Sequence, residues 1–523
     1  MFETNMAEPS SPTAEPDFIV GATAAGAAQV NSPTSGAPEN LRQQTTRGGV
    51  ISIVAQAGKF AVRTGSMVIL ARLLAPDDFG LVGMVTAFTG FLALFKDAGL
   101  CMATVQRDHV TEEQMATLFW VNMAVGVALA MLTVVLAPLL ASFYHEPRLT
   151  WVTVALAVGF IFSGASSQHQ ALLQRNMRFG ALAIVEMISL VLTTAVSVGM
   201  AFAGMKYWAL VGMATGLSAL NAVGLWVAAN WIPGRPRLRS GVRSMLQYGG
   251  TITVNSVVAY LMYNAEKVLL GRFWGAVTLG VYGRAYQLIN LPTDNLNTVL
   301  GFVAFPALSR VQGDPERLRK YFLEGYGLFL SLVMPITVAC ALFSVDIVRV
   351  LLGPKWNEAA NIFRLLSPTI LSFAIINPLY WLMLAQGQAV RSLKIALMIA
   401  PIVILGYVIG LRHGPEGVAL GYSTAMMVVV IPSVLWAKHG TLITGVDILR
   451  ATLRPFVCVI AGVVAVWAAS QMLGHIGPVF LRLVVSNIIL FGVYVLCLLF
   501  VMGQKERYFQ LVRDSGLGSF RKK

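Results

Sequence analysis

Charged residues are scarce in this chain of 523 residues. Asp, Glu, Lys and Arg together make up 12% of it, whereas soluble domains contain roughly 25%. Hydrophobic residues make up 56%, and the mean hydropathy is +0.71. Part of so much apolar surface has to face lipid, because too few polar residues are present to cover it in water. Composition therefore excludes a soluble enzyme and a soluble nucleic-acid-binding protein.

Motifs for metal, disulfide or nucleotide chemistry are missing as well. The cysteines are widely separated, and neither a Cys-x-x-Cys nor a His-Glu-x-x-His spacing occurs, so we expect no disulfide framework and no metal site. No Gly-x-x-x-x-Gly-Lys-Ser/Thr loop occurs, which argues against ATP hydrolysis by this chain. We expect no cofactor and no enzymatic activity.

Apolar stretches of about 20 residues, the length that crosses ~30 Å of hydrocarbon as a helix, follow one another from residue 48 onwards. Residues 1–45, by contrast, are rich in Pro, Ala, Ser, Thr and Glu, and we expect them to form a disordered cytoplasmic tail. The sequence predicts an all-α, polytopic membrane protein with about fourteen transmembrane helices. They lie near 48–72, 79–100, 114–143, 149–169, 181–203, 207–230, 246–271, 276–309, 321–343, 359–386, 392–411, 415–437, 450–473 and 478–502.

Basic residues collect in alternate loops, which explains the net charge of +14 without a nucleic-acid partner. With both termini inside, cytoplasmic segments hold 24 Lys and Arg residues and outside loops hold 8. Such a bias is typical of cytoplasmic loops in inner-membrane proteins. We therefore expect a multi-pass protein of the cell inner membrane with both termini in the cytoplasm.

An internal repeat occurs at an offset of 200 residues. Residues 69–83, ILARLLAPDDFGLVG, lie without gaps over residues 269–283, LLGRFWGAVTLGVYG. The identical pairs are Leu70/Leu270, Arg72/Arg272, Gly80/Gly280 and Gly83/Gly283. Each repeat opens a six-helix half, and an even helix number gives the two halves the same direction, related by a pseudo-two-fold axis along the membrane normal. The expected domains are the tail 1–45, an N-lobe 46–245, a C-lobe 246–440, two further helices in 441–503 and a basic cytoplasmic tail 504–523.

Several segments resemble one family of membrane transporters. LARLLAPDDFGLVGMVTAFTGFLALFKDAGLCMATVQR (70–107) resembles the opening signature of the polysaccharide transporter family, which contains Wzx-type oligosaccharide flippases and exopolysaccharide exporters. ALLQRNMRFGALAIVEM (171–187) is similar to a later loop of that family, and further similar segments are 264–292, 305–319 and 351–356. The resemblance covers about residues 48–440 and excludes the N-terminal tail.

This resemblance implies a fold, a substrate and a mechanism. The fold is two lobes around a central cavity that opens alternately to each side of the membrane. The substrate is a polyprenyl-diphosphate-linked oligosaccharide, such as a repeat unit of O-antigen (lipopolysaccharide), capsule or exopolysaccharide. It would pass from the inner to the outer leaflet with ion or proton exchange as the driving force. The expected partners are this lipid-linked substrate, membrane lipids, and a polysaccharide polymerase with its export machinery.

Basic residues inside the predicted spans are the candidate substrate-binding residues, because a buried cation costs at least ~2.5–3.5 kcal/mol on insertion scales. Lys59 and Arg63 lie four residues apart and so share one helix face. They are candidates to bind a diphosphate or an acidic sugar. The alternative is that they pair with acidic residues on the second or eighth helix, or extend to the headgroup layer.

Two further cations belong to the second half. Lys267 follows Glu266 directly, and the two side chains point about 100° apart, so they do not pair within the helix. Lys267 is a candidate for substrate binding, and an interhelical salt bridge is the alternative. Arg284 lies in a span interrupted by Pro292 and Pro306, where freed backbone carbonyls are tolerated mainly beside a cavity. We expect Arg284 to line that cavity.

Acidic residues near or within the spans are candidates for coupling, since a carboxyl group in a low-dielectric cavity can exchange a proton as the cavity opens. The alternative for each of them is a salt bridge. The candidates are Asp97, Glu186, Asp294 and Glu324.

Two other functions remain open from the sequence. A multidrug exporter of the related MATE-type superfamily needs an acidic or apolar cavity for cationic drugs, and the basic residues in the spans argue against it. A membrane-embedded glycosyltransferase or polysaccharide polymerase needs carboxylates or bases on sizeable external loops. The predicted external loops here are short.

Overall fold

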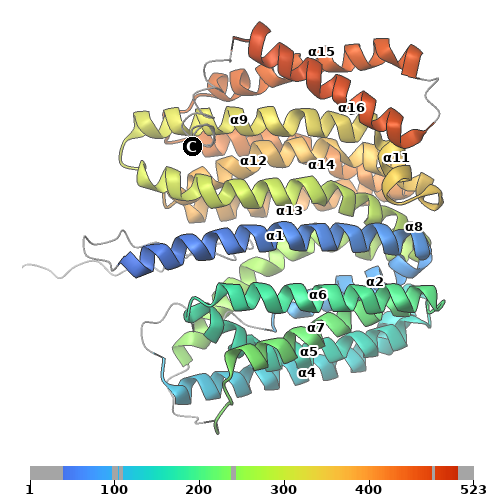
Figure 1. The fold of residues 1–523 in the computed structure, drawn as a ribbon, viewed down its shortest axis with the longest axis vertical. Coiled ribbons are helices and arrows are strands. Elements are labelled where there is room, and N and C mark those ends of the chain that lie inside the picture. Colours follow the sequence, from blue (N-terminus) through green and yellow to red (C-terminus); the bar gives the residue numbers. More distant parts are fainter. Residues whose placement is uncertain (1–38, 97–103, 105–109, 237–242, 474–477, 504–523) are drawn as a thin grey trace, which may run out of the picture.

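The computed structural model describes residues 39–96, 104, 110–236, 243–473 and 478–503. Within these residues the secondary structure is helical, without any β-strand, and the long helices lie roughly side by side (Figure 1). The predicted all-α fold is confirmed. The helices are α1 (Glu39–Leu73), α2 (Pro76–Ala93), α4 (Glu112–Tyr144), α5 (Leu149–Arg175), α6 (Phe179–Phe202), α7 (Trp208–Ala229), α8 (Arg243–Arg310), α9 (Pro315–Leu342), α10 (Ser344–Leu351), η1 (Pro354–Trp356), α11 (Asn357–Leu366), α12 (Pro368–Ala385), α13 (Ala389–Leu411), α14 (Gly414–Lys438), α15 (Gly445–Leu473), α16 (Val479–Leu496) and the π-helical turn η2 (Cys497–Val501).

Ten of the described helices are long and apolar enough to cross a membrane. The chain is therefore a multi-pass membrane protein. The expected number of fourteen spans is not confirmed by this measure, since the ten do not include α1, α2 or α8. Charged residues interrupt the apolar sequence of these helices: Lys59 and Arg63 in α1, Asp77 and Asp78 in α2, and Arg284 among others in α8.

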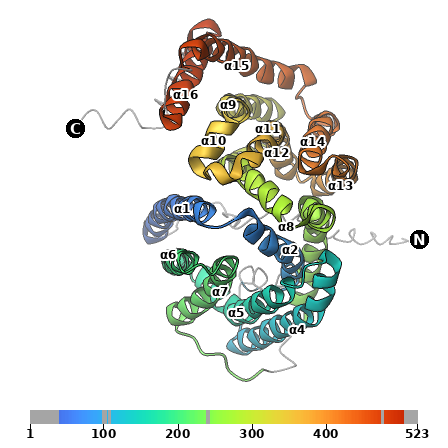
Figure 2. The same ribbon diagram turned by 90° about the vertical axis from the view of Figure 1, so that its right-hand side faces the viewer.

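The helices form two groups with an additional pair. In the first group α4 packs on α5, α5 on α7, and α6 on both α7 and α1. In the second group α12 packs on α8, α9 and α14, and α13 packs on α8 and α14. The extensive contact between α2 and α8 joins the two groups, while α15 and α16 pack against each other and against α9 (Figure 2).

A sharp bend at Gly275 divides α8 into two arms, residues 243–274 and 276–310. Gly275 has φ 80° and ψ −178°, a backbone conformation open essentially to glycine alone. The predicted spans 246–271 and 276–309 correspond to these arms. We call the end of the molecule where α1 ends, α2 begins and α8 bends the crossing end; it lies at the right in Figure 1.

One predicted span is wrong as a single helix. The sequence analysis placed a helix over residues 359–386, and the structure has two, α11 and α12, separated at Ser367. Pro368 begins α12 at its first position. A proline lacks the N–H group that would continue the preceding helix, and its ring restricts the residue before it, so a helix commonly restarts at that point.

Candidate functional site

The two halves meet at α2 and the second arm of α8, where glycines allow the backbones to touch. A Cβ atom placed on Gly80 would lie 1.7 Å from the carbonyl oxygen of Ala276. A Cβ placed on Gly280 would lie 1.9 Å from the carbonyl oxygen of Pro76. Pro76 thus contacts Gly280, and Gly80 contacts Ala276. At the offset of 200 residues, 76 corresponds to 276 and 80 to 280, so the two contacts are equivalent. This reciprocity is what a pseudo-two-fold axis through the contact produces.

Aromatic side chains cover the C-terminal end of α1 and the C-terminal end of the first arm of α8, which lie on opposite sides of this contact. The Trp356 indole N–H donates to the carbonyl oxygen of Ala71 at 2.8 Å, and the Arg72 guanidinium donates to the carbonyl oxygen of Val350. In the other half, a Cβ on Gly271 would lie 2.8 Å from the Tyr144 ring. Aromatic side chains thus cover Ala71 and its counterpart Gly271, and the crossing end is closed in this structure.

Charged side chains add to this closure. Arg148, in the turn between α4 and α5, lies 2.7 Å from a carboxylate oxygen of Asp77 at the start of α2 and 2.8 Å from one of Glu146. The hydrogen bond from Arg148 lowers the pKa of Glu146 from its usual value. Asp77 therefore holds the Arg148 guanidinium against the first turn of α2, and Glu146 orients it from within the same turn.

Arg284 lies next to this closed contact, on the second arm of α8 one turn beyond Gly280. Its guanidinium carbon is 4.0 Å from the centre of the Phe79 ring, and its Nε is buried without a hydrogen-bond partner. Among the described residues no carboxylate pairs with it. At 1.5 Å per residue, Arg284 is about 14 Å along the helix from Gly275, which is close to half the thickness of the hydrocarbon layer.

The Phe79 ring connects Arg284 to the crossing end. Phe79 is buried, and its ring centre is 5.4 Å from that of Trp356 in an edge-to-face arrangement. Trp356 in turn holds the end of α1 through its hydrogen bond to Ala71. A change in the position of the Arg284 side chain would therefore reach the closed end through one aromatic contact.

Lys59 and Arg63 on α1 are brought together with Glu186 on α6. The Lys59 ammonium pairs with one carboxylate oxygen of Glu186, and the Arg63 guanidinium lies 3.2 Å from the other. Close packing of Gly58 against Met187 aligns the two helices at this level. The side chain of Arg63 is 62% exposed, so it remains accessible to a further anion.

This cluster combines three of the predicted site residues. The alternative prediction placed the acidic partners of Lys59 and Arg63 on the second or eighth helix. Their partner is acidic as expected, but it lies on α6. One carboxylate cannot neutralise two cations, and the cluster keeps a net charge of about +1 at neutral pH. Arg63 is ten residues from the end of α1, about 15 Å at helical rise, a depth similar to that of Arg284.

Comparison with known proteins decides the family of this chain. The sequence profile of the family described as polysaccharide biosynthesis protein matches residues 69–361, more than half of the chain. The chain belongs to this family. The matched segment includes both glycines of the α2–α8 contact and Arg284, whereas Lys59 and Arg63 lie just before it.

Two curated relatives extend the match. The chain is 25% identical over 408 residues to the lipopolysaccharide biosynthesis protein WzxC of Escherichia coli strain K12, which covers 76% of this chain and 80% of that protein. It is 24% identical over 327 residues to the succinoglycan biosynthesis transport protein ExoT of Rhizobium meliloti strain 1021, with 62% of this chain and 66% of that protein covered.

The fold is also that of a solved flippase. The lipid II flippase MurJ, in its inward closed conformation, matches with a TM-score of 0.71 over 85% of this chain and 97% of that chain. The sequence identity is 15%, so this likeness concerns the fold alone. It confirms the transporter fold that the resemblance in the sequence implied.

The other predicted site residues are not brought together in the structure, and one of them lies outside the described residues. Lys267 donates a hydrogen bond to the Asn264 side chain at 2.7 Å, and the described residues show no interhelical salt bridge to it. Asp294 is exposed on α8, and Glu324 is half-buried on α9. Asp97 lies outside the described residues. The roles proposed for these four side chains stay predictions.

Glu266 is the residue that the sequence analysis did not propose as a coupling group. Its side chain is completely buried, and neither carboxylate oxygen has a hydrogen-bond partner. The hydroxyl groups of Tyr282, Tyr407 and Tyr422 lie within electrostatic reach of it, and those of Tyr282 and Tyr407 are themselves unpaired. The Tyr407 and Tyr422 rings stack with their centres 5.3 Å apart. Burial in such surroundings disfavours the charged form of a carboxyl group.

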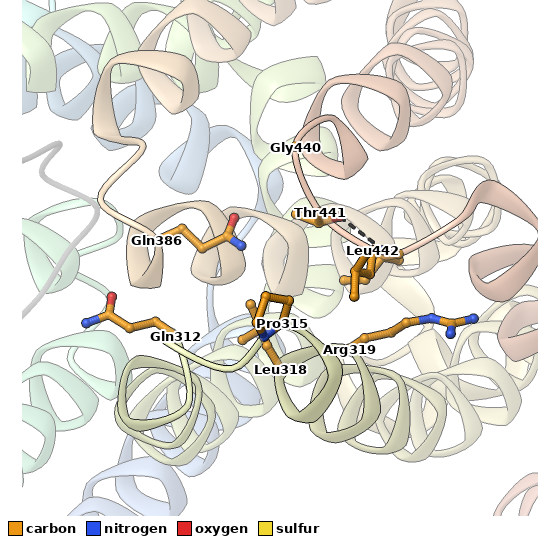
Figure 3. Close-up of a pocket in the computed structure, with 9 residues that line it drawn as sticks. Gln312, Pro315, Leu318, Arg319, Gln386, Gly440, Thr441 and Leu442 are labelled. Atoms are coloured by element: carbon orange, nitrogen blue, oxygen red, sulfur yellow. Dashed lines mark hydrogen bonds between the residues drawn. The ribbon is translucent and has the colours of Figure 1, made fainter.

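A cavity of about 400 Å³ lies away from all of these charges. It is at the end of the second group opposite the crossing end, where the turns before α9, α13 and α15 meet (Figure 3). Its polar side chains are those of Gln312, Arg319, Gln386 and Thr441. The central cavity between the lobes, implied by the family resemblance, stays a prediction.

Proposed function

We propose that this chain moves a polyprenyl-diphosphate-linked oligosaccharide from the inner to the outer leaflet of the cytoplasmic membrane by alternating access. The family membership supports a role in polysaccharide biosynthesis, and the name of one relative, a succinoglycan biosynthesis transport protein, supports transport. The fold shared with a lipid II flippase supports a lipid-linked sugar as the class of substrate. The product is a repeat unit of O-antigen, capsule or exopolysaccharide.

Arg284 is the observation that carries this proposal. The Arg284 side chain is half-buried at a helix contact, without a carboxylate partner and with a buried Nε that makes no hydrogen bond, and this arrangement is costly for the folded protein. The cost is removed when an anion arrives, and the planar fork of Arg donors suits a phosphate group. The diphosphate of the substrate is such an anion, and its charge is what prevents it from crossing the bilayer alone.

The cluster of Lys59, Arg63 and Glu186 provides a second contact at similar depth. Its residual positive charge attracts a diphosphate or an acidic sugar, while Glu186 keeps the two cations from repelling each other in the empty transporter. In the orientation predicted from the basic loops, the crossing end faces outward and both termini face the cytoplasm. The substrate then enters from the cytoplasmic side, opposite the closed end, and a polymerase takes over the product outside.

The same charges argue against the two other functions. A multidrug exporter for cationic compounds would present them with Arg284 and Arg63, which repel positive charge. A glycosyltransferase or polymerase needs paired carboxylates or bases near a sugar bond. Among the described acidic residues, Asp77 and Glu146 pair with Arg148, and Glu186 pairs with Lys59 and Arg63, so these carboxylates are already engaged in ion pairs.

Depletion of the protein tests the proposed substrate. We expect complete repeat units linked to polyprenyl diphosphate to accumulate, and mass analysis of the extracted lipids measures them together with the glycan that they carry. Loss of a polymerase would instead leave single repeat units outside. Unchanged levels of lipid-linked sugars after depletion would contradict the proposal.

We further propose Glu266 as the residue that couples transport to protons. Burial disfavours its charged form, and release of its proton is favoured in a conformation that admits water to the second group of helices. Glu266→Gln mimics the neutral form permanently, so we expect folding to be retained and export to fall at least tenfold. Export of labelled polysaccharide at external pH 6 and pH 8 measures the effect.

A matched variant controls for the loss of any acidic residue in a span. Glu416→Gln, in the first turn of α14, changes an exposed carboxyl group, and we expect its export to stay within about twofold of the wild type at both pH values. Export by Glu266→Gln at the normal rate, with the normal pH dependence, would rule out Glu266. If export instead requires sodium ions, and Glu266→Gln abolishes that requirement, sodium and not the proton is the coupling ion.

A further inference from the structure

A small polar pocket lies between α9 and α15, at the end of the molecule opposite the crossing end. Its volume is about 140 Å³, and it is lined by Gly327 and Ser331 on α9 and by Arg450 and Arg454 on α15. At ~30 Å³ for each water molecule, it has room for four or five waters. A phosphate group is of this size, whereas an oligosaccharide is not.

The two arginines of this pocket have no acidic partner among the described residues. Arg450 and Arg454 are four residues apart on α15, so they lie on one face of the helix. Asp447 also lines the pocket, but it accepts three hydrogen bonds from Arg319, at 2.9 to 3.2 Å, and further ones from Thr444. Its charge is therefore already neutralised, and the pocket stays positive.

The pocket is at the level of lipid headgroups. Arg454 is followed by Pro455 and by the long apolar stretch of α15 that continues to Leu473. Exposed apolar side chains extend from the arginines along the same helix, at the helical spacing that forms a ridge. They are Leu453, Val457, Ile460 and Val464, with 45% to 57% of each exposed.

We propose that this pocket binds the phosphate of an anionic phospholipid whose acyl chains lie along the α15 ridge. The two unpaired guanidinium groups supply the positive charge, and the open space beside Gly327 accommodates the phosphate group. Basic pockets between transmembrane helices at the headgroup level suit such lipids. The site is independent of the proposed transport function, because it requires neither the substrate nor a change of conformation.

Gly327 makes the pocket testable without removing any charge. A Cβ atom placed on it meets nothing within 4 Å, so the first carbon of an added side chain fits there without a clash. Gly325, two residues earlier on α9, is equally free of contacts but does not line the pocket. Gly327→Leu and Gly325→Leu therefore form a matched pair of a filled pocket and a control.

Native mass spectrometry of the purified full chain, titrated with phosphatidylglycerol or phosphatidylcholine, tests the proposal. One basic residue near the membrane surface contributes about fivefold in affinity for an anionic lipid. We expect the double variant Arg450→Gln/Arg454→Gln to bind phosphatidylglycerol about 20-fold more weakly, and Gly327→Leu at least fivefold more weakly. Gly325→Leu and the exposed-arginine control Arg317→Gln should stay within about twofold.

The outcomes separate this proposal from its competitors. Equal weakening of phosphatidylcholine binding would show a site for acyl chains only and would overturn the assignment. So would unchanged phosphatidylglycerol binding in the Gly327→Leu protein. A third titration uses polyprenyl phosphate: if it displaces phosphatidylglycerol from this pocket at a tenfold lower concentration, the site belongs to the lipid of the substrate. These lipid-binding measurements do not depend on whether an Arg284 variant loses export.

Discussion

Replacing Arg284 by methionine should reduce export of the polysaccharide at least 100-fold. The length of the side chain is retained, but the positive charge beside the α2–α8 contact is lost. Each hydrogen bond to a charged group contributes about 1.5–3 kcal/mol, and two such bonds to a phosphate correspond to a factor of at least ~100. Complementation of a deletion strain, with the exported polysaccharide quantified, measures the effect.

The stability of the same variant distinguishes a binding role from a structural one. Arg284 has no carboxylate partner, so its removal leaves no buried charge behind, and we expect the melting temperature of the purified protein not to fall. Arg364→Met is the matched control: Arg364 is exposed on α11, where it donates a hydrogen bond to Asn361 at 2.7 Å. That variant should export normally. Normal export by Arg284→Met would refute the binding role.

Gly280→Ala should prevent the crossing end from closing. The added methyl group would lie 1.9 Å from the carbonyl oxygen of Pro76, so α2 and α8 have to separate by more than 1 Å. Alanine favours a helix over glycine by about 1 kcal/mol, and any loss must therefore come from the contact between the helices. We expect export to fall at least tenfold.

The position of α2 relative to α8 can be measured directly. In a cysteine-free background, a single cysteine at Leu279, a buried residue that packs near Gly83, reports whether the contact has opened. Its labelling by a water-soluble maleimide should be at least tenfold faster in Gly280→Ala. Gly283→Ala, with nothing within 4 Å of its Cβ, serves as the control and should label slowly. Equal labelling rates in both variants would contradict a closed crossing end.

Much of this fold could be predicted from the sequence. The repeat at an offset of 200 marks Gly80 and Gly280 as counterparts, and the structure shows them in one reciprocal contact. The division of α8 near Gly275 also follows from the sequence, since the apolar pattern is interrupted there. The break at Ser367 could not have been found from Pro368 alone, because Pro335 lies inside α9 and Pro378 inside α12 without ending those helices.

The charged contacts between helices could not be predicted. Lys59 and Glu186 are 127 residues apart, and hydropathy does not show which faces of two membrane helices meet. Glu266 was not proposed because its neighbour Lys267 is the candidate for substrate binding, with an interhelical salt bridge as the alternative. In the structure the two side chains point in different directions, Lys267 to Asn264 and Glu266 into a cluster of tyrosines. Only three-dimensional packing separates the two roles.

The most direct test of the central claim is the leaflet in which the finished lipid-linked repeat unit is found. In cells depleted of the protein, a membrane-impermeant glycosidase or periodate reagent is added from outside, and the surviving lipid-linked units are counted by mass analysis. We predict that the units are protected in depleted cells, become accessible when the wild-type protein is restored, and stay protected with Arg284→Met. Accessible units in the depleted cells would contradict the account, because they would have crossed the membrane without this protein.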